Sequence, residues 1–241
     1  MPTPRHLRTA PIAEALLDIR VKGANDFDPI SFLTLEQELQ LILPKKQEHR
    51  LTKFEVHVPP SQAPIIEDQG LQGIFFKSED DKDIAQFRID GFTINRLAPY
   101  TRWEDILSRA QHLWPLYVRV ARPLEITRLA LRYINRIPLP GGEELTMYMR
   151  VPLGVPPELP PNISDLFYRI TIHDVELAAH VTQSFEVRGP DATWLLDIDA
   201  FREGPWEPDN PSIYETLDHL RDFKNRIFFN LLTEAAIQRF E

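Results

Sequence analysis

Arginine side chains recur along one face of residues 126–137, which read ITRLALRYINRI. In an extended strand, successive side chains point to opposite faces of the sheet. The odd-numbered positions are mainly apolar and are expected to pack on a helix, whereas Arg128, Arg132 and Arg136 share the other face. Such a strand must lie inside a sheet that covers its apolar face and compensates the charge on the opposite one.

The arginine face has two physical explanations, and the sequence leaves both open. Neighbouring arginines are about 13 Å apart along the strand, a spacing that suits an extended or multiply phosphorylated anion. Alternatively, Asp197 and Asp199 share one face of a later strand, and Asp18 shares a face with Arg20 near the N-terminus. If these strands adjoin, opposite charges would pair across them, each pair contributing roughly 0.2–1 kcal/mol. We favour this charge ladder, because half-buried arginines nearly always have acidic partners.

Apolar periodicity in the first half predicts strands before a long helix. The expected elements are a strand at 14–23, a helix at 29–43, strands at 50–58 and 73–78, a hairpin at 83–97 that turns at Asp90-Gly91, and a helix at 101–120. Thr101 and Glu104 have the spacing of a helix capping box. Pro115 is expected to kink or interrupt the last turns of this helix, because it lacks an amide hydrogen.

The second half repeats this order of elements. The expected elements are the strand at 126–137, a short helix within 141–153, strands at 165–177, 178–189 and 193–201, and a helix from Ser212 towards 239. Residues 212–215 repeat the hydroxyl, any residue, aromatic, glutamate pattern of residues 101–104. The proline-rich stretch 138–163 indicates a linker or an extended loop.

This order predicts an α+β fold in which two similar β-α-β-β-β-α halves form a mostly antiparallel sheet packed on two long helices. The halves are expected at residues 1–122 and 123–241, folded together as one unit.

Composition excludes several classes of protein. The 36 Asp and Glu residues outnumber the 27 Lys and Arg residues, which works against non-specific binding of nucleic acid. Cysteine is absent, so disulfides, a thiol nucleophile and cysteine-ligated zinc are excluded. No apolar run approaches the roughly 20 residues needed to span a bilayer, and Glu14 interrupts any signal-like segment at the N-terminus. We therefore expect a cytoplasmic protein without membrane association.

Five segments together resemble one protein family. They are PIAEALLDIRV (11–21), DGFTINRLAPYTRWEDI (90–106), RLALRYINRIPLP (128–140), LLDIDAF (195–201) and RIFFNLLTEAAIQRF (226–240). In these segments the chain resembles a sporadically distributed prokaryotic family marked by an LRYINRI strand motif, with residues 131–137 as the most specific part. The resemblance implies a prokaryotic origin and a single co-folded chain, and it carries over no activity or catalytic residue.

The candidate ligand-binding residues lie on the two charged strand faces and one loop. They are Arg20, Arg128, Arg132, Arg136, Asp197, Asp199 and Trp206. Trp206 lies near prolines in EGPWEPDNP, where it is expected to cover a pocket or to clasp the loop onto the core. Glu215 and His219 are one helical turn apart, as metal ligands often are, but we expect them on a solvated helix face.

No glycine-rich phosphate loop, nucleophile elbow or zinc-protease motif is present, so the sequence identifies no catalytic residue and no cofactor. The main hypothesis is a non-enzymatic, cytoplasmic accessory protein that binds an anionic small molecule or a protein partner in a cleft between its two halves. One alternative is a metal-dependent enzyme acting on a phosphorylated substrate, with Mg²⁺ on Asp197 and Asp199 and the anion on Arg132 and Arg136. The other alternative is a single-stranded nucleic-acid binder, which the net charge of −9 disfavours. The sequence indicates no oligomeric state.

Overall fold

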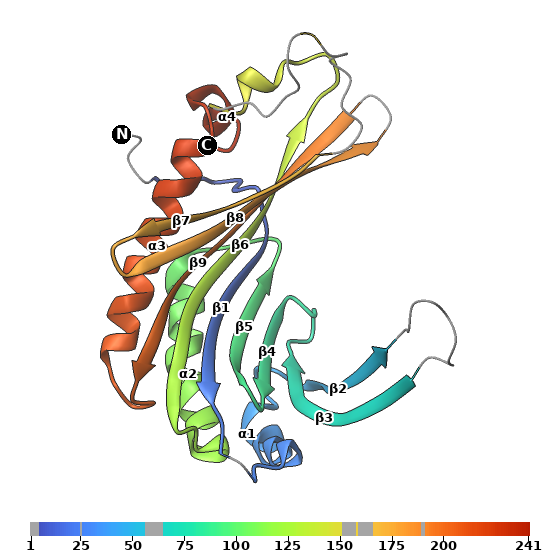
Figure 1. Cartoon of the computed structure of the whole chain (residues 1–241), viewed down its shortest axis with the longest axis vertical. Coiled ribbons are helices and arrows are strands. Elements are labelled where there is room, and N and C mark those ends of the chain that lie inside the picture. The colour runs from blue at the N-terminus through green and yellow to red at the C-terminus, as the bar shows by residue number, and fades with distance from the viewer. Residues whose placement is uncertain (1–4, 25, 56–64, 151–157, 159–165, 189–190) are drawn as a thin grey trace.

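Nine strands pair into one sheet in the computed structural model, which describes residues 5–24, 26–55, 65–150, 158, 166–188 and 191–241 (Figure 1). The strands are β1 (Ile12–Lys22), β2 (Lys45–Glu55), β3 (Ile65–Lys77), β4 (Asp83–Arg88), β5 (Gly91–Leu97), β6 (Glu125–Leu139), β7 (Phe167–Asp174), β8 (Leu177–Arg188) and β9 (Asp191–Trp206).

The strand order across the sheet is β2-β3-β4-β5-β1-β6-β9-β8-β7. Every neighbouring pair is antiparallel. The strands β1 and β6 are far apart in the sequence, yet they pair beside each other in the interior of the sheet. These findings confirm the expected α+β class and the antiparallel sheet.

Two helices of the fold are several turns long. The helical elements are η1 (Pro29–Leu35, a 3-10 helix), α1 (Glu36–Leu39), α2 (Trp103–Ala121), η2 (Leu145–Met147, a 3-10 helix), α3 (Ser212–Leu231) and α4 (Glu234–Gln238). The helix α2 contacts β5 and β1, and α3 contacts β9, β6 and β8. Trp103 on α2 donates a hydrogen bond from Nε1 to the Asp218 carboxylate on α3 at 2.8 Å, so the two helices meet over the sheet.

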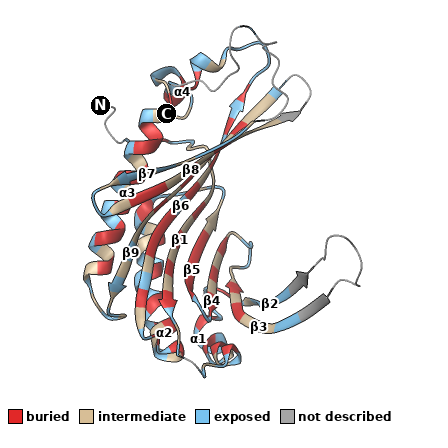
Figure 2. Cartoon of the chain, in the orientation of Figure 1, coloured by how far each residue is buried: buried red, intermediate tan, exposed pale blue. Residues whose placement is uncertain are grey.

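Burial along β6 follows the predicted alternation, as Figure 2 shows in red and pale blue. Leu129, Leu131 and Tyr133 are almost fully buried beneath the helices, whereas Arg132 and Arg136 are exposed on the other face. The buried apolar residues of β1, β6, β9, α2 and α3 belong to one continuous core.

The helix expected at 29–43 is wrong in length and in its buried face. Residues 29–35 form a 3-10 helix, and only Glu36–Leu39 is α-helical. A 3-10 helix has three residues per turn, so it turns other side chains inward than an α-helix would. Phe32 and Leu39 are buried, whereas Ile30 and Ile42, which the α-helical pattern assigned to the core, are 44% and 47% exposed.

Both expected helix caps are also wrong. The residue before α2 is Arg102, and the one before α3 is Pro211; neither makes a capping hydrogen bond through its side chain. The helix α2 continues through Pro115 to Ala121. The last helix ends at Leu231, and α4 begins anew where the Thr233 hydroxyl accepts a hydrogen bond from the Ala236 amide at 3.1 Å.

The predicted strands are all present, but two of them begin several residues earlier than expected: β2 begins at Lys45 instead of residue 50, and β3 begins at Ile65 instead of residue 73. The hairpin at 83–97 forms β4 and β5, but its turn lies at Ile89 and Asp90, and Gly91 already belongs to β5. A side chain on Gly91 would lie 2.4 Å from the Ile19 carbonyl oxygen of β1, so glycine is required for this close approach. The β-α-β-β-β-α pattern is wrong for the first half, which contributes five strands instead of four, whereas the second half contributes four. Residues 56–58 and most of 151–165, from the predicted strand and linker, lie outside the described residues.

Within the part of the chain that is described, none of the helices combines the length and the apolar character needed to cross a bilayer.

Candidate functional site

Arg128 and Arg132 on β6 each meet an aspartate of the neighbouring strand β9. In the register of these strands, Arg132 lies opposite Asp199, and Ile134 lies opposite Asp197. Arg132 reaches its diagonal neighbour, with Nη2 2.6 Å from Asp197 Oδ2. Arg128 lies opposite Glu203 and instead reaches along the strand to Asp199, with Nη2 2.8 Å from Oδ2. The predicted cross-strand pairing is confirmed for these residues.

Arg136 also has an acidic partner, although not one of the predicted aspartates. Its Nη2 atom lies 2.7 Å from the Glu186 carboxylate on β8, the strand beyond β9. The long guanidinium side chain thus reaches past the nearest strand.

Asp18 on β1 contacts several of the basic side chains on this face of the sheet. Its carboxylate accepts hydrogen bonds from Arg20 Nε at 2.9 Å, from Arg88 Nη2 at 3.1 Å and from the Thr93 hydroxyl. Arg128 Nη1 lies 3.7 Å away. Burial raises the pKa of Asp18, but the Thr93 hydrogen bond and the charges of Arg20 and Arg88 outweigh it and lower the pKa below its usual value.

This face of the sheet is therefore neutralised by its own carboxylates. Arg20, Arg128, Arg132 and Arg136 each lie within ion-pair distance of an acidic side chain. The described residues contain no group of three or more His, Asp and Glu side chains that could hold a metal ion. Glu215 and His219 are both exposed on α3.

Trp206 lies at the end of β9 and pairs with Ile126, so its expected position in a loop is wrong. Its ring packs against the core, and the Arg202 guanidinium lies 5.5 Å from the ring centroid. Gly204 makes room for this arrangement, because a side chain there would lie 2.9 Å from the Trp206 ring. Trp206 thus packs the end of β9 against the core.

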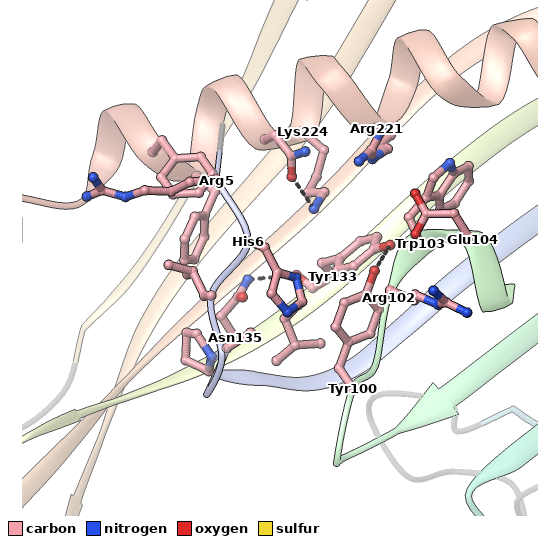
Figure 3. Close-up of a pocket in the computed structure, with 17 residues that line it drawn as sticks. Arg5, His6, Tyr100, Arg102, Trp103, Glu104, Tyr133, Asn135, Arg221 and Lys224 are labelled. Carbon is pink, nitrogen blue, oxygen red and sulfur yellow. Dashed lines mark hydrogen bonds between the residues drawn. The ribbon is translucent and has the colours of Figure 1, made fainter. Parts of the chain in front are cut away.

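A cavity of about 210 Å³ lies on the opposite, helix-covered side of the sheet (Figure 3). Its walls come from four parts of the chain: residues 5–12 near the N-terminus, residues 100–104 at the start of α2, β6, and residues 221–229 of α3. It is therefore built where the two expected halves of the chain meet.

Lys224 extends from α3 into this cavity and is only 8% exposed. Its Nζ atom lies 3.7 Å from the centroid of the Tyr133 ring and donates a hydrogen bond to Asn225 Oδ1 at 2.6 Å. Among the described residues, no carboxylate lies within 4.0 Å of Nζ. Burial, and to a smaller extent the charge of Arg221, lower the pKa of Lys224 to about 7.

Two tyrosine hydroxyls meet on the floor of the cavity. The Tyr100 and Tyr133 oxygens are 3.3 Å apart, and Figure 3 shows them pointing toward each other below Lys224. Burial raises the pKa of both tyrosines, so both hydroxyls stay protonated at neutral pH. Only one of the two protons can lie between the oxygens, which leaves the other for a further acceptor.

The rim of the cavity carries more cations than anions. Arg5 pairs with Glu234 and Glu241, and Arg102 pairs with Asp105, so these two arginines are compensated. Within the described chain, Arg221 has no carboxylate within ion-pair distance. Glu104 and the exposed His6 complete the charged and titratable lining. The lining thus carries two cationic residues without a carboxylate partner in the described chain, the buried Lys224 and the half-buried Arg221, and one acidic residue, the exposed Glu104.

Sequence reasoning missed this site because its residues belong to patterns that predict core. Tyr133 occupies an apolar position of β6, and Lys224 falls within the buried stripe of α3 between Leu220 and Ile227. A lysine in such a stripe was the available signal, since lysine is almost never fully buried unless it is paired.

A comparison with protein-family models finds no match for this chain, and a search among curated proteins also finds none.

Proposed function

We propose that this protein is a non-enzymatic binding protein that holds a small anionic molecule in the cavity around Lys224. The observation that carries the proposal is a buried lysine that faces a cavity with no carboxylate partner among the described residues. A buried charge is costly unless it is paired. A bound carboxylate or phosphate would supply the missing partner, and Arg221 would add a second cation.

The size of the cavity supports a small ligand. Drug-sized ligands occupy pockets of about 300–1,000 Å³. The cavity here has about 210 Å³, which suits a molecule of a few non-hydrogen atoms with a single charged group.

We further propose that the cavity marks the junction of an internal duplication. The first strand of each half pairs with the last strand of the same half, β1 with β5 and β6 with β9, and a long helix follows each of these last strands. Ligand sites commonly lie between domains or repeated units. We also propose that the chain belongs to the family with the LRYINRI motif and that it is cytoplasmic.

The two alternative functions have weaker support. Magnesium binding would require Asp197 and Asp199 to release the arginines that now neutralise them. A nucleic-acid surface would need cations free to meet phosphates, whereas the arginines of β6 alternate with acidic partners.

The proposal is tested by thermal denaturation with a panel of small anions: acetate, pyruvate, succinate and phosphate. A ligand at about 100 times its Kd adds roughly 2.7 kcal/mol to the free energy of unfolding. We expect at least one of the four to stabilise the wild-type protein, and Lys224→Met to remove that effect. Lys22→Met, which removes an exposed lysine remote from the cavity lining, is the matched control and should retain it. If none of the four anions raises the melting temperature, or if both variants respond like the wild type, the proposal is wrong.

A further inference from the structure

The amine of Lys224 is placed as a nucleophile would be. It is the end of a side chain that points from α3 into a cavity, with the Tyr133 ring at 3.7 Å on one side and the Asn225 amide oxygen at 2.6 Å on another (Figure 3). An ammonium group at this position loses hydration without gaining an ion pair. The fraction of Lys224 in the neutral amine form, which has a free electron pair, is therefore larger than that of a surface lysine.

Every element around the amine contributes to this balance. Arg221 precedes Lys224 by three residues on α3, so both lie on one face of the helix and repel each other as cations. The N-terminal segment contributes His6, and α2 contributes Glu104 beyond ion-pair distance of the amine. Lysines become nucleophilic when they are desolvated in an apolar pocket or lie next to another cation. Both conditions are met here.

The tyrosine pair supplies what carbonyl chemistry requires next to such an amine. The hydroxyls of Tyr100 and Tyr133 are protonated and 3.3 Å apart, and one proton remains for an acceptor in the cavity. A carbonyl oxygen that gains negative charge during attack is such an acceptor.

We infer that Lys224 captures a small 2-oxo acid as a Schiff base, with the carboxylate of the ligand on Arg221 and its carbonyl oxygen on the Tyr100–Tyr133 pair. This inference rests on the proposed anion-binding function and names the ligand class. The Nζ electron pair forms a bond to the carbonyl carbon, and a proton moves from nitrogen to oxygen to give a carbinolamine. The carbon–oxygen bond then breaks, a second proton leaves with the oxygen as water, and a carbon–nitrogen double bond remains. Hydrolysis reverses the capture, so no co-reactant is consumed.

The test is reductive trapping on the full-length protein with pyruvate and cyanoborohydride at neutral pH. We expect one adduct per chain, in a peptide that contains Lys224, with the mass of pyruvic acid less one oxygen atom. About half of a lysine with a pKa near 7 is neutral at pH 7, against less than about one in 1,000 for a surface lysine, so by the neutral fraction alone labelling should favour Lys224 by at least about 500-fold.

Two variants and two small molecules sharpen the test. Lys224→Met should lose the adduct while retaining its circular dichroism spectrum, and Lys22→Met should keep the adduct. Lactate, which has the carboxylate but no carbonyl group, should slow the labelling as a competitor. Acetone, which has the ketone group but no carboxylate, should label Lys224 at least about 10-fold more slowly, because it forgoes the charged hydrogen bond to Arg221.

The experiments distinguish a failure of the Schiff-base inference from a failure of the proposed binding function. If anions stabilise the protein through Lys224 but pyruvate leaves no reducible adduct there, the Schiff base is overturned and the binding function stands. If adducts spread equally over the surface lysines, or if acetone labels as fast as pyruvate, the inference is also overturned. If neither stabilisation nor an adduct at Lys224 is observed, both proposals fall.

Discussion

Lys224 is a cation that folding removes from water without providing a carboxylate among the described residues. Its pKa is about 7 in the folded protein, against an ordinary value of 10.5. Between these two pH values the unfolded chain holds the proton more often than the folded one does. Below about pH 7, the buried amine is charged and lowers the free energy of unfolding by its full amount. This destabilisation shrinks as the pH rises from about 7 to about 10.5.

Replacing Lys224 by Met should therefore stabilise the protein in a pH-dependent way. We expect the free energy of unfolding to increase by about 2–4 kcal/mol near pH 6, and the gain to shrink as the pH approaches about 10. Urea denaturation of both proteins across this range measures the difference. A gain that stays constant with pH, or a loss at low pH, would contradict the assignment of Lys224 as a buried, uncompensated amine. Lys22→Met controls for the loss of a lysine and should change stability little.

At the scale of elements, α2 tolerates a proline that should interrupt it. Pro115 lies in the interior of the helix with its ring exposed, and the helix continues to Ala121 because Leu113, Trp114, Leu116 and Tyr117 are buried on both sides of it. Burial of these side chains offsets the missing backbone hydrogen bond.

Pro115→Ala should restore that hydrogen bond and relieve the clash with the preceding turn. We expect the free energy of unfolding to rise by about 1–3 kcal/mol, measured by urea denaturation. Pro211→Ala is a suitable control, because Pro211 precedes the first turn of α3, where a missing amide hydrogen has no cost. If both variants gain equally, Pro115 does not strain its helix.

The pairing of β6 with β9 predicts that two ion pairs with the same chemistry contribute unequally to the free energy of unfolding. The Arg128 side chain is 23% exposed, contacts Asp199, and lies 4.4 Å from the centroid of the Phe201 ring. The Arg132 side chain is 47% exposed and pairs with Asp197. Surface ion pairs contribute little, whereas removing one partner of a buried pair leaves an uncompensated charge.

Arg128→Met should therefore destabilise the protein by about 2 kcal/mol, and Arg132→Met by less than about 1 kcal/mol. Both changes retain an apolar stem of similar length, so the comparison isolates the charge. Equal losses in urea denaturation, or a larger loss for Arg132→Met, would show that burial does not decide the strength of these pairs.

At the scale of the whole molecule, the pairing of β1 with β6 joins the two halves within one sheet and one core. If one half of the chain unfolded, the other half would expose the edge of its first strand and the apolar face below it. Such an edge is a liability for a folded protein. We therefore expect the two halves to unfold together.

Four tryptophans allow this to be tested, because Trp103 and Trp114 lie in the first half and Trp194 and Trp206 in the second. Two double Trp→Phe variants would each keep fluorescence in one half only. In each variant, the fluorescence midpoint in urea should coincide with the midpoint from circular dichroism, as in a single cooperative transition. Separate midpoints in either variant would mean that the halves are independent domains.

Predictions from the sequence succeeded where a residue's neighbours are set by strand alternation. The two faces of β6 and the pairing of Arg128 and Arg132 with aspartates follow from a period of two. Predictions failed at the helix caps and in the segment 29–43, where the choice between α-helical and 3-10 geometry depends on contacts of η1 with β3 and α2. Local patterns contain no information about such contacts.

The sequence alone determined the class of fold and the antiparallel strands, and it favoured acidic partners for the arginines over a bound anion, because hydrophobic periodicity and charge alternation act over neighbouring residues. Only the tertiary structure decided that the uncompensated charge lies elsewhere. Lys224 and Tyr133 both occupy positions typical of core, and they become a site because four separate parts of the chain leave a cavity around them. Whether a buried polar group has a partner depends on residues distant in the sequence, and those residues come together only in the folded chain.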